Sequence, residues 1–215
     1  MKKLTSSLIA AGVIAGASMS APVMAEGPSM NVNITNDYIW RGVTQSGNKA
    51  AIQGGLDWEM DKVSFGVWGS SLYDSNPALT NPGSGGSEID LYGAYNFGPV
   101  SVGAIYYYYD TAGGSFYEVN AGGDVGPVSL AASYAPDGGA YYLEGSGSFP
   151  VGKASLDLHL GYGDSYTTAS GGTALDYSVA VSGSAAGLDM ALGYWKSDAA
   201  ADSEGKVFVN IGKSM

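Results

Sequence analysis

The feature that most constrains the fold is an alternation of apolar and polar residues that recurs along nearly the whole chain. In residues 89–97, Ile, Leu, Gly, Tyr and Phe occupy every second position. A period of two is that of a β-strand with two different faces, because successive side chains point to opposite sides. Twelve segments show this pattern: 30–40, 52–60, 63–67, 89–97, 100–108, 117–125, 128–134, 141–149, 154–162, 175–181, 188–194 and 207–211.

The connections between these segments are alternately short and long. The short connections are Asp61-Lys62, two Gly-Pro pairs, residues 150–153 and residues around 184–187. The other connections are longer and polar. A soluble β-sandwich also alternates along its strands, so we weigh the connections more heavily. Short turns at one end and longer loops at the other are typical of an outer-membrane barrel. The sequence therefore predicts an all-β fold, a transmembrane antiparallel up-and-down barrel of about twelve strands, with both termini at the short-turn end.

The first 25 residues are predicted to be a secretory signal peptide. They have a basic start at Lys2 and Lys3, an apolar stretch and the small-residue pattern Val23-Met24-Ala25 before a cleavage point. The apolar stretch is too short for a membrane-spanning helix, which is the alternative interpretation. Residues 26–215 then form one barrel domain, exported to the outer membrane of a Gram-negative bacterium.

Charge and composition exclude several functions. All 20 acidic residues but only seven of the nine Lys and Arg follow residue 25, so the exported chain carries a formal charge of −13. Nucleic-acid binding needs clustered positive charge and is not expected. The absence of cysteine excludes disulfides and thiolate metal sites. The partners that we expect are outer-membrane lipid, the barrel-assembly and periplasmic chaperone machinery during transit, and small solutes.

Aromatic residues are predicted to form two girdles at the membrane interfaces. Four consecutive tyrosines, residues 106–109, put rings on both faces of one strand just before a longer loop. Rings at the rim of a barrel keep their apolar part in lipid and their polar group in water. The girdle residues that we predict are Trp58, Phe97, Tyr106, Tyr108, Tyr134, Tyr162 and Tyr194.

The opposite phase of the strands carries the charged residues, which are predicted to line the lumen. An unpaired carboxylate is costly in lipid, so these side chains require water or hydrogen-bond partners. The predicted lumen-lining residues are Arg41, Asp57, Glu59, Glu88, Asp90, Tyr107, Glu118, Glu144, Asp157, His159 and Asp176. Arg41 is the sole arginine, and it either braces several carboxylates or lies at the mouth of the pore, with Lys196.

Two functions from different classes fit this barrel. One is a porin-like channel that passes small polar solutes or cations by diffusion, narrowed by its inward tyrosines and by residues 45–55 or 71–87 folding inward. The other is a closed structural or adhesive barrel that binds surfaces through its loops. The excess of acids in the lumen favours the channel.

Catalysis, cofactors and metals are not expected. His159, Ser178 and Ser182 are residue types that a serine hydrolase uses. However, the sequence has no nucleophile-elbow motif around either serine, so we do not expect this activity. Asp198, Asp202 and Glu204 do not follow the spacing of a calcium loop, and a solvated acidic loop is the preferred interpretation.

Several blocks of the sequence resemble the TorF-like porin family. They are NDYIWRGVTQSGNKAAIQGGLDWEM, SFGVWGS, EIDLYGAYNF, GAIYYYYD, YYLEGSGSFP and FVNIGKSM, and together they extend over nearly the whole exported chain. The resemblance implies a proteobacterial outer-membrane barrel with a channel role and an uncharacterised substrate. One departure is the C-terminal residue, which is Met215 where the family usually has an aromatic residue.

The barrel hypothesis predicts heat-dependent gel migration. Because the apolar phase is free of charge, the purified protein should remain folded in detergent and migrate differently before and after boiling. Semi-native electrophoresis measures this, and a protein that is soluble without detergent and shows no shift would contradict the hypothesis.

Overall fold

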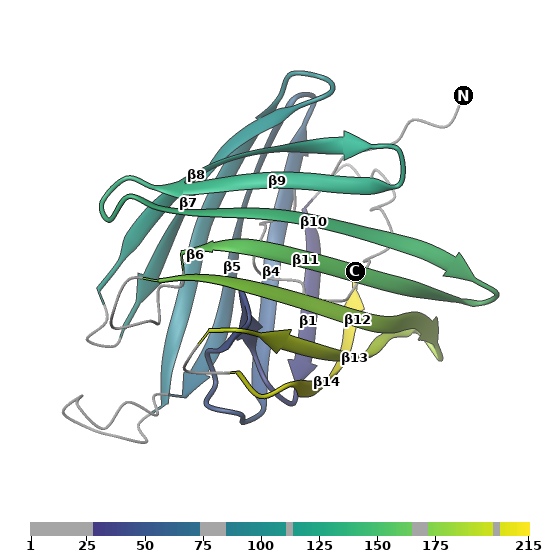
Figure 1. Ribbon diagram of the computed structural model, residues 1–215. Coiled ribbons are helices and arrows are strands. Elements are labelled where there is room, and N and C mark those ends of the chain that lie inside the picture. The colour runs from purple at the N-terminus through teal and green to yellow at the C-terminus, as the bar shows by residue number, and fades with distance from the viewer. Residues whose placement is uncertain (1–27, 74–84, 111–113, 165–171, 200–202) are drawn as a thin grey trace.

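The structure, a computed structural model, describes residues 28–73, 85–110, 114–164, 172–199 and 203–215, so the predicted signal peptide lies outside the described residues. The described chain is all-β and forms a closed antiparallel barrel of twelve strands in the order β1-β14-β13-β12-β11-β10-β9-β8-β7-β6-β5-β4 (Figure 1). Its strands are β1 (Ser29–Thr35), β4 (Ala51–Met60), β5 (Val63–Tyr73), β6 (Gly85–Asn96), β7 (Ser101–Tyr109), β8 (Phe116–Val125), β9 (Val128–Ala135), β10 (Ala140–Val151), β11 (Ala154–Asp164), β12 (Thr173–Ala185), β13 (Leu188–Ser197) and β14 (Lys206–Ser214). No described helix has the length and hydropathy needed to cross a membrane.

The ring closes through β1, which pairs with both β14 and β4. The amide of Met30 donates to the carbonyl of Met215 at 2.9 Å, and the amide of Met215 donates back at 2.8 Å. Both ends of the barrel chain therefore lie at the end with the short turns, as the alternation of turns predicts. The twelve predicted strands are confirmed.

The short turns are built from residues that accept a left-handed backbone. Ala186 and Gly187 connect β12 to β13 with φ angles of 55° and 78°. Two positive φ angles in succession are those of a type I′ turn, whose twist matches that of the flanking strands. The connection between β10 and β11 is shorter than predicted, because β10 continues to Val151 and leaves only residues 152–153 in the turn.

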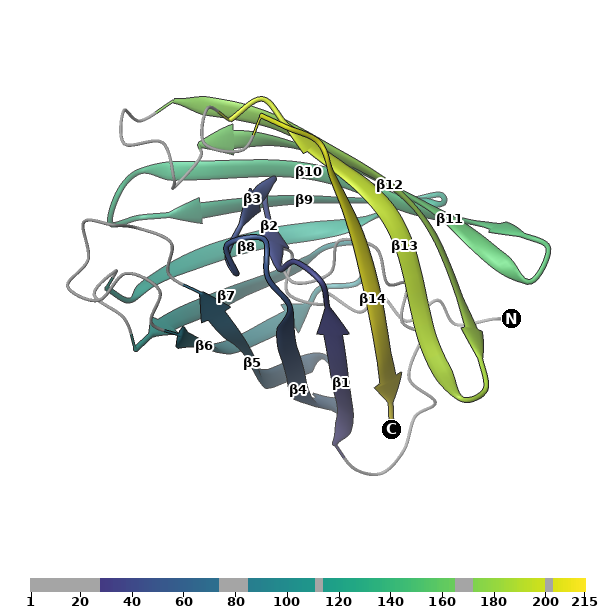
Figure 2. The ribbon, with the colours of Figure 1, turned by 90° about the horizontal axis from the view of Figure 1, so that it is seen from below.

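The first strand ends earlier than the sequence predicts. The alternation continues to Trp40, but β1 stops at Thr35 and the chain turns into the barrel. Asn36 ends the ladder with β14, because its side-chain amide donates to the carbonyl of Val207 at 3.0 Å and its oxygen accepts from the amide of Val209 at 2.6 Å. Two short strands follow, β2 (Ile39–Trp40) and β3 (Val43–Thr44), which pair with each other and lie inside the ring (Figure 2).

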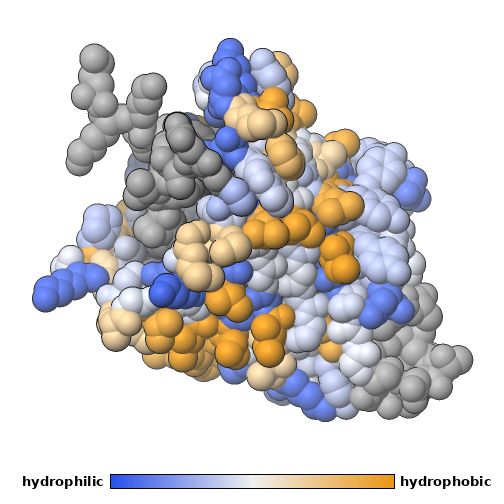
Figure 3. Space-filling view, turned by 180° about the vertical axis from the view of Figure 1, so that it is seen from behind, coloured by the Kyte–Doolittle hydropathy of each residue, from blue (hydrophilic) through white to orange (hydrophobic). Residues whose placement is uncertain are grey.

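The outer surface of the barrel is apolar. Leu91, Leu160, Val181 and Leu192 are each 55–58% exposed, and many other Val, Ile, Leu and Tyr side chains on the same phase are also exposed. Figure 3 shows such side chains gathered on one face of the wall. Monomers that are stable in water rarely expose apolar patches of this extent, whereas lipid covers them without cost. The fold is therefore of the outer-membrane type.

The topology predicts which turns reach the cell surface. The chain has no native cysteine, so single cysteines can be introduced at Asp137, in the loop between β9 and β10, or at Gly187. Longer loops of such barrels face outward, so an impermeant maleimide should label intact cells carrying Asp137→Cys and should label Gly187→Cys only after lysis. The opposite labelling would mean that the barrel is inserted upside down.

Candidate functional site

The segment inside the barrel, Asn36–Ser46, is a compact structure that we call the lumen hairpin. Arg41 and Gly42 form its two-residue turn, with φ angles of 48° and 78°. Its base is tied by Asp37, whose Oδ1 accepts hydrogen bonds from the hydroxyls of Thr44 at 2.5 Å and Ser46 at 3.0 Å. An arginine in the left-handed region costs free energy, of order 1–3 kcal/mol, so a contact of its side chain is needed to offset that cost.

Arg41 makes that contact with Glu118 on β8. Its Nη1 and Nη2 donate to Oε1 and Oε2 of Glu118 at 2.7 and 2.8 Å, and both side chains are at most 5% exposed. Tyr107 donates a further hydrogen bond to the same carboxylate at 3.2 Å. The guanidinium also lies 4.4 Å from the ring centroids of Trp40 and Tyr142. Arg41 is thus held inside the lumen by one bidentate pair, and does not lie at the mouth.

Apolar side chains attach the lumen hairpin to both sides of the wall. Tyr38 and Trp40 belong to one buried cluster, and Ile39 and Val43 belong to two others. Their wall partners are Ala51, Trp68, Ile105 and Tyr107 in the first cluster, Ala180, Trp195 and Phe208 in the second, and Ala174 and Ala199 in the third. The hairpin therefore crosses the lumen from β5–β7 to β12–β14.

Gly42 allows a close approach of the hairpin to the wall. A Cβ atom at this position would lie 2.5 Å from Cβ of Ser197 and 2.8 Å from Cβ of Asp176. Such distances exclude any side chain, and the positive φ angle favours glycine independently.

Tyr38 of the hairpin keeps its hydroxyl proton. Burial raises the pKa of this hydroxyl well above its ordinary value, with a further contribution from the charge of Glu88, so the group remains a hydrogen-bond donor.

Polar networks occupy the lumen beside the hairpin. Nε2 of His159 lies 3.0 Å from Oδ1 of Asp176, whose Oδ2 accepts from the hydroxyl of Tyr142 at 2.9 Å. Glu144 lies near the other ring nitrogen, with 3.7 Å between its Oε2 and Nδ1. Both nitrogens of His159 therefore face carboxylates, and the structure gives no hydrogen bond from either to Ser178.

The remaining predicted lumen residues lie in different environments. Tyr92 donates to Asp57, Tyr109 donates to Glu88 at 2.9 Å, and Asp157 is buried. Glu59 is exposed near the short-turn end of β4. Asp90 is the exceptional residue, because it has no exposed surface and neither carboxylate oxygen has a hydrogen-bond partner among the described residues.

The lumen has two unlike halves. Toward the long loops, the inward residues are large and buried: Trp68, Tyr107, Tyr142, Trp195 and Phe208. Toward the short turns, many inward residues are small and half-buried, among them Ser64, Gly66, Ala94, Gly103, Gly122, Ala131 and Ser155, whereas Ser101 and Ser182 are buried. The lumen hairpin lies in the first half, so the barrel is filled near the long loops and less filled near the short turns.

The predicted girdle residues lie on the outer surface. Tyr106, Tyr108, Tyr134, Tyr162 and Tyr194 are 40–46% exposed and lie toward the long-loop ends of their strands. At the other rim, Phe97 is 65% exposed and Trp58 stacks on Phe65 with 5.5 Å between ring centroids. These positions are consistent with two interfacial belts.

Sequence reasoning missed the residues by which the hairpin is anchored. It expected residues 45–55 or 71–87 to fold inward, whereas the inward segment is Asn36–Ser46 and β4 begins at Ala51. Residues 74–84 lie outside the described chain. The available signal was Gly42 between apolar residues, because glycine suits the second position of a two-residue hairpin turn.

The described residues contain no group of three or more His, Cys, Asp or Glu positioned to hold a metal ion. Of the three acids weighed for calcium, Asp202 lies outside the described residues, while Asp198 and Glu204 are exposed.

Comparison with known proteins identifies the family. A family profile described as "Bacterial protein of unknown function (Gcw_chp)" matches residues 19–214. The chain belongs to this family. The description names no porin, so membership of the TorF-like family remains a prediction. No curated protein matches the chain.

Among solved structures, the chain is similar to OmpT, an outer membrane protein of Vibrio cholerae that was folded in vitro and solved in its trimer form. The two are 10% identical, the match covers 85% of this chain and 63% of that chain, and the TM-score is 0.27. The chain thus spans less than two thirds of the length of this structure.

The Arg41–Glu118 pair predicts a strong effect on stability. Arg41→Ala leaves the buried carboxylate of Glu118 without its counter-charge and should lower the free energy of unfolding by about 3–5 kcal/mol, while replacing both residues by Leu should restore much of the loss. Equilibrium unfolding by urea in lipid vesicles measures this.

The control is Lys153→Ala, which removes a positive charge at an exposed short turn and should change stability by about 0.5 kcal/mol or less. If Arg41→Ala were as stable as this control, the pair would not hold the hairpin.

Proposed function

We propose that this protein is an outer-membrane channel of a Gram-negative bacterium, through which small polar solutes or cations diffuse passively. The lumen hairpin is its constriction. The protein is exported with a signal peptide, residues 1–25, that is cleaved, and the barrel reaches the outer membrane through periplasmic chaperones and the barrel-assembly machinery. The exposed apolar wall supports the membrane location.

The observation that carries this proposal is the unequal filling of the lumen. A barrel that serves only as a scaffold gains stability when inward side chains fill it throughout. Here small inward residues leave the short-turn half partly accessible, while the long-loop half is narrowed by one inserted segment. A less filled half that leads to a more filled one is the shape that we expect of a channel with a constriction.

The charge of the lumen supports cations over anions. Glu88, Asp90 and Glu118 are buried at inward positions of β6 and β8, which flank β7, and Arg41 compensates one of the three. Fixed carboxylates raise the local concentration of cations and repel anions, most strongly in a narrow pore of low dielectric constant.

A closed structural or adhesive barrel is the second candidate. It is favoured by the contacts of the lumen hairpin with both sides of the wall and by the burial of the Arg41–Glu118 pair. The two candidates differ in whether ions pass the hairpin.

Ion conduction tests the proposal. The refolded protein in a planar bilayer should conduct, and a KCl gradient should give a reversal potential of cation-selective sign. Glu88→Gln with Asp90→Asn should shift this potential toward anions, with the largest shift at low ionic strength because salt screens the carboxylates. Glu118 is left unchanged, because its neutralisation would also release Arg41.

The matched control is Asp61→Asn with Asp137→Asn, which changes the net charge equally at two exposed turns and should leave selectivity unaltered. A wild type that prefers anions would overturn the assigned role of the carboxylates. If neither the wild type nor Arg41→Ala conducts at any voltage, the closed barrel is the correct function.

A further inference from the structure

The carboxyl group of Asp90 on β6 is closed off from solvent. The residue is 0% exposed, and neither carboxylate oxygen has a hydrogen-bond partner among the described residues. A side chain without exposed surface leaves no room for a water molecule or a hydrated cation to touch it. The charged form of such a group is costly, because nothing replaces the hydration that it has lost.

The groups that face Asp90 repel a negative charge more than they balance it. Glu88 lies two positions away on the same phase of β6, and its Oε2 also lacks a hydrogen-bond partner among the described residues. Arg41, the one cation among the facing groups, is engaged by the carboxylate of Glu118. The titratable and charged groups around Asp90 are Glu88 and Tyr92 on β6, Tyr107 and Tyr109 on β7, Glu118 on β8, and Tyr38 and Arg41 on the lumen hairpin, while its neighbour on β5 is Trp68.

The lumen hairpin covers this carboxyl group. In the wall, Asp90 lies between Trp68 and Tyr107, its cross-strand neighbours on β5 and β7. Tyr38 packs edge-on against Trp68 with 5.6 Å between ring centroids, and Trp40 packs against Tyr107 at 5.9 Å. The aromatic face of the hairpin therefore closes over Asp90, and movement of this face away from β6 would admit water to the carboxyl group.

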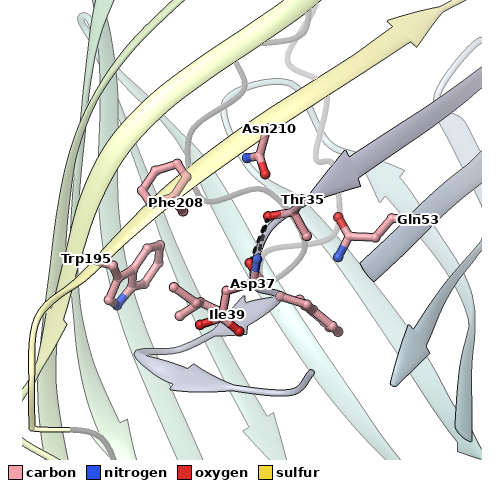
Figure 4. A pocket seen from close by; sticks show the side chains of 8 residues that line it. Thr35, Asp37, Ile39, Gln53, Trp195, Phe208 and Asn210 are labelled. Carbon is pink, nitrogen blue, oxygen red and sulfur yellow. Dashed lines mark hydrogen bonds between the residues drawn. The ribbon is translucent and has the colours of Figure 1, made fainter. Parts of the chain in front are cut away.

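The base of the hairpin is less closely packed toward β13 and β14. A pocket of about 20 Å³ lies there, and its lining on the wall is Thr35, Gln53, Trp195, Phe208 and Asn210 (Figure 4). A cavity of roughly 10–15 Å³ holds one water molecule, so water fits beside the base of the hairpin. The hairpin thus has space on this side that it lacks against β6.

We propose that Asp90 is a proton-binding site and that the lumen hairpin keeps its position against β6 and β7 only while Asp90 is protonated. A proton neutralises the carboxylate without needing room of its own. When the carboxyl oxygen gives its proton to water at higher pH, the charge that remains requires hydration, and the hairpin has to move to admit it. A group that is neutral in the closed arrangement and charged in the open one favours the closed arrangement at low pH and the open one at high pH.

The consequence for transport rests on the proposed channel function. The constriction should widen as the pH rises, and the same step places a charged carboxylate in the lumen, where it attracts cations. Protonation of Asp90 and the position of the hairpin are both measured without conduction.

Infrared spectroscopy of the detergent-refolded full chain in D₂O tests the protonation. Exposed Asp and Glu side chains are ionised at neutral pH, since their ordinary pKa values are about 4, so a carbonyl band of protonated carboxyl groups reports buried ones. The wild type should show this band at neutral pD, and Asp90→Asn should lower its intensity. The control Asp137→Asn changes an exposed loop and should leave the band intact. A band that is absent from the wild type, or unchanged in Asp90→Asn, would overturn the proton site.

A cysteine at Ala51 reports the position of the hairpin. Ala51 is 1% exposed and belongs to the cluster that Tyr38 and Trp40 complete. The labelling rate of Ala51→Cys by a water-soluble maleimide is divided by that of Asp137→Cys at the same pH, which corrects for the thiolate fraction. Between about pH 5 and about pH 9, where ordinary carboxyl groups stay ionised, this relative rate should rise by up to about tenfold per pH unit, the effect of one proton.

Variants of Asp90 identify the group that titrates. Asp90→Asn and Asp90→Leu are neutral at every pH, so Ala51→Cys should stay protected in both. His159→Gln is the matched control, because histidine titrates in the same range but this one faces Glu144 and Asp176. It should keep the pH dependence. Heat-dependent gel migration establishes that each variant is folded.

The outcomes separate this inference from the proposed function. Loss of the pH dependence in His159→Gln, or its persistence in the Asp90 variants, would overturn the role of Asp90 even if the protein conducts. A pH-dependent exposure of Ala51→Cys in a protein that conducts at no pH would leave the proton site intact and overturn the channel.

Discussion

The structure depends on one constraint, which is that every backbone amide and carbonyl of a strand in lipid must find a partner within the protein. Pairing of β1 with both β14 and β4 meets this constraint by closing the ring, so that no strand has a free edge. Once the ring is closed, the two phases of each strand face different solvents. Apolar side chains must occupy the outer phase, and polar ones are tolerated only on the inner phase.

The inner phase creates a second problem, because carboxylates there require water, cations or hydrogen-bond donors. The described lumen meets this need with tyrosine hydroxyls at Asp57, Glu88 and Asp176, and with the guanidinium of Arg41 at Glu118. Since Arg41 belongs to the lumen hairpin, the electrostatic balance of the wall and the position of the hairpin are coupled. If the hairpin moves, Glu118 loses its counter-charge, and if Glu118 is changed, the hairpin loses its ion pair to the wall.

This coupling gives both candidate functions a common physical basis. Apolar contacts are not directional, so a hairpin held by them alone could bury the same apolar surface in several positions. A bidentate ion pair, in contrast, specifies a single orientation. In a channel, that orientation defines the cross-section available to solutes. In a structural barrel, it makes the wall rigid. Asp90 stands apart from both, because it is fully buried and neither of its carboxylate oxygens has a hydrogen-bond partner among the described residues, so its charged form carries a large desolvation cost.

The sequence by itself determined the barrel wall. A strand is recognised by its period of two and by the turns at its ends, and both are local features of the sequence. Segments such as Ile89–Phe97 and turns such as Ala186-Gly187 could therefore be predicted from neighbouring residues alone. The phase of Glu118 and Asp176 was readable for the same reason. The aromatic residues at the strand ends were also predicted from position alone.

Only the tertiary structure decided where the alternating run of the first strand leaves the wall. Tyr38 and Trp40 continue the apolar phase of Met30, Val32 and Ile34, yet they face Trp68 and Tyr107 inside the barrel and not lipid. Lipid and a packed lumen both accept an aromatic ring, so periodicity cannot distinguish them. The choice depends on contacts with residues 30 or more positions away, and on an arginine whose partner lies on another strand.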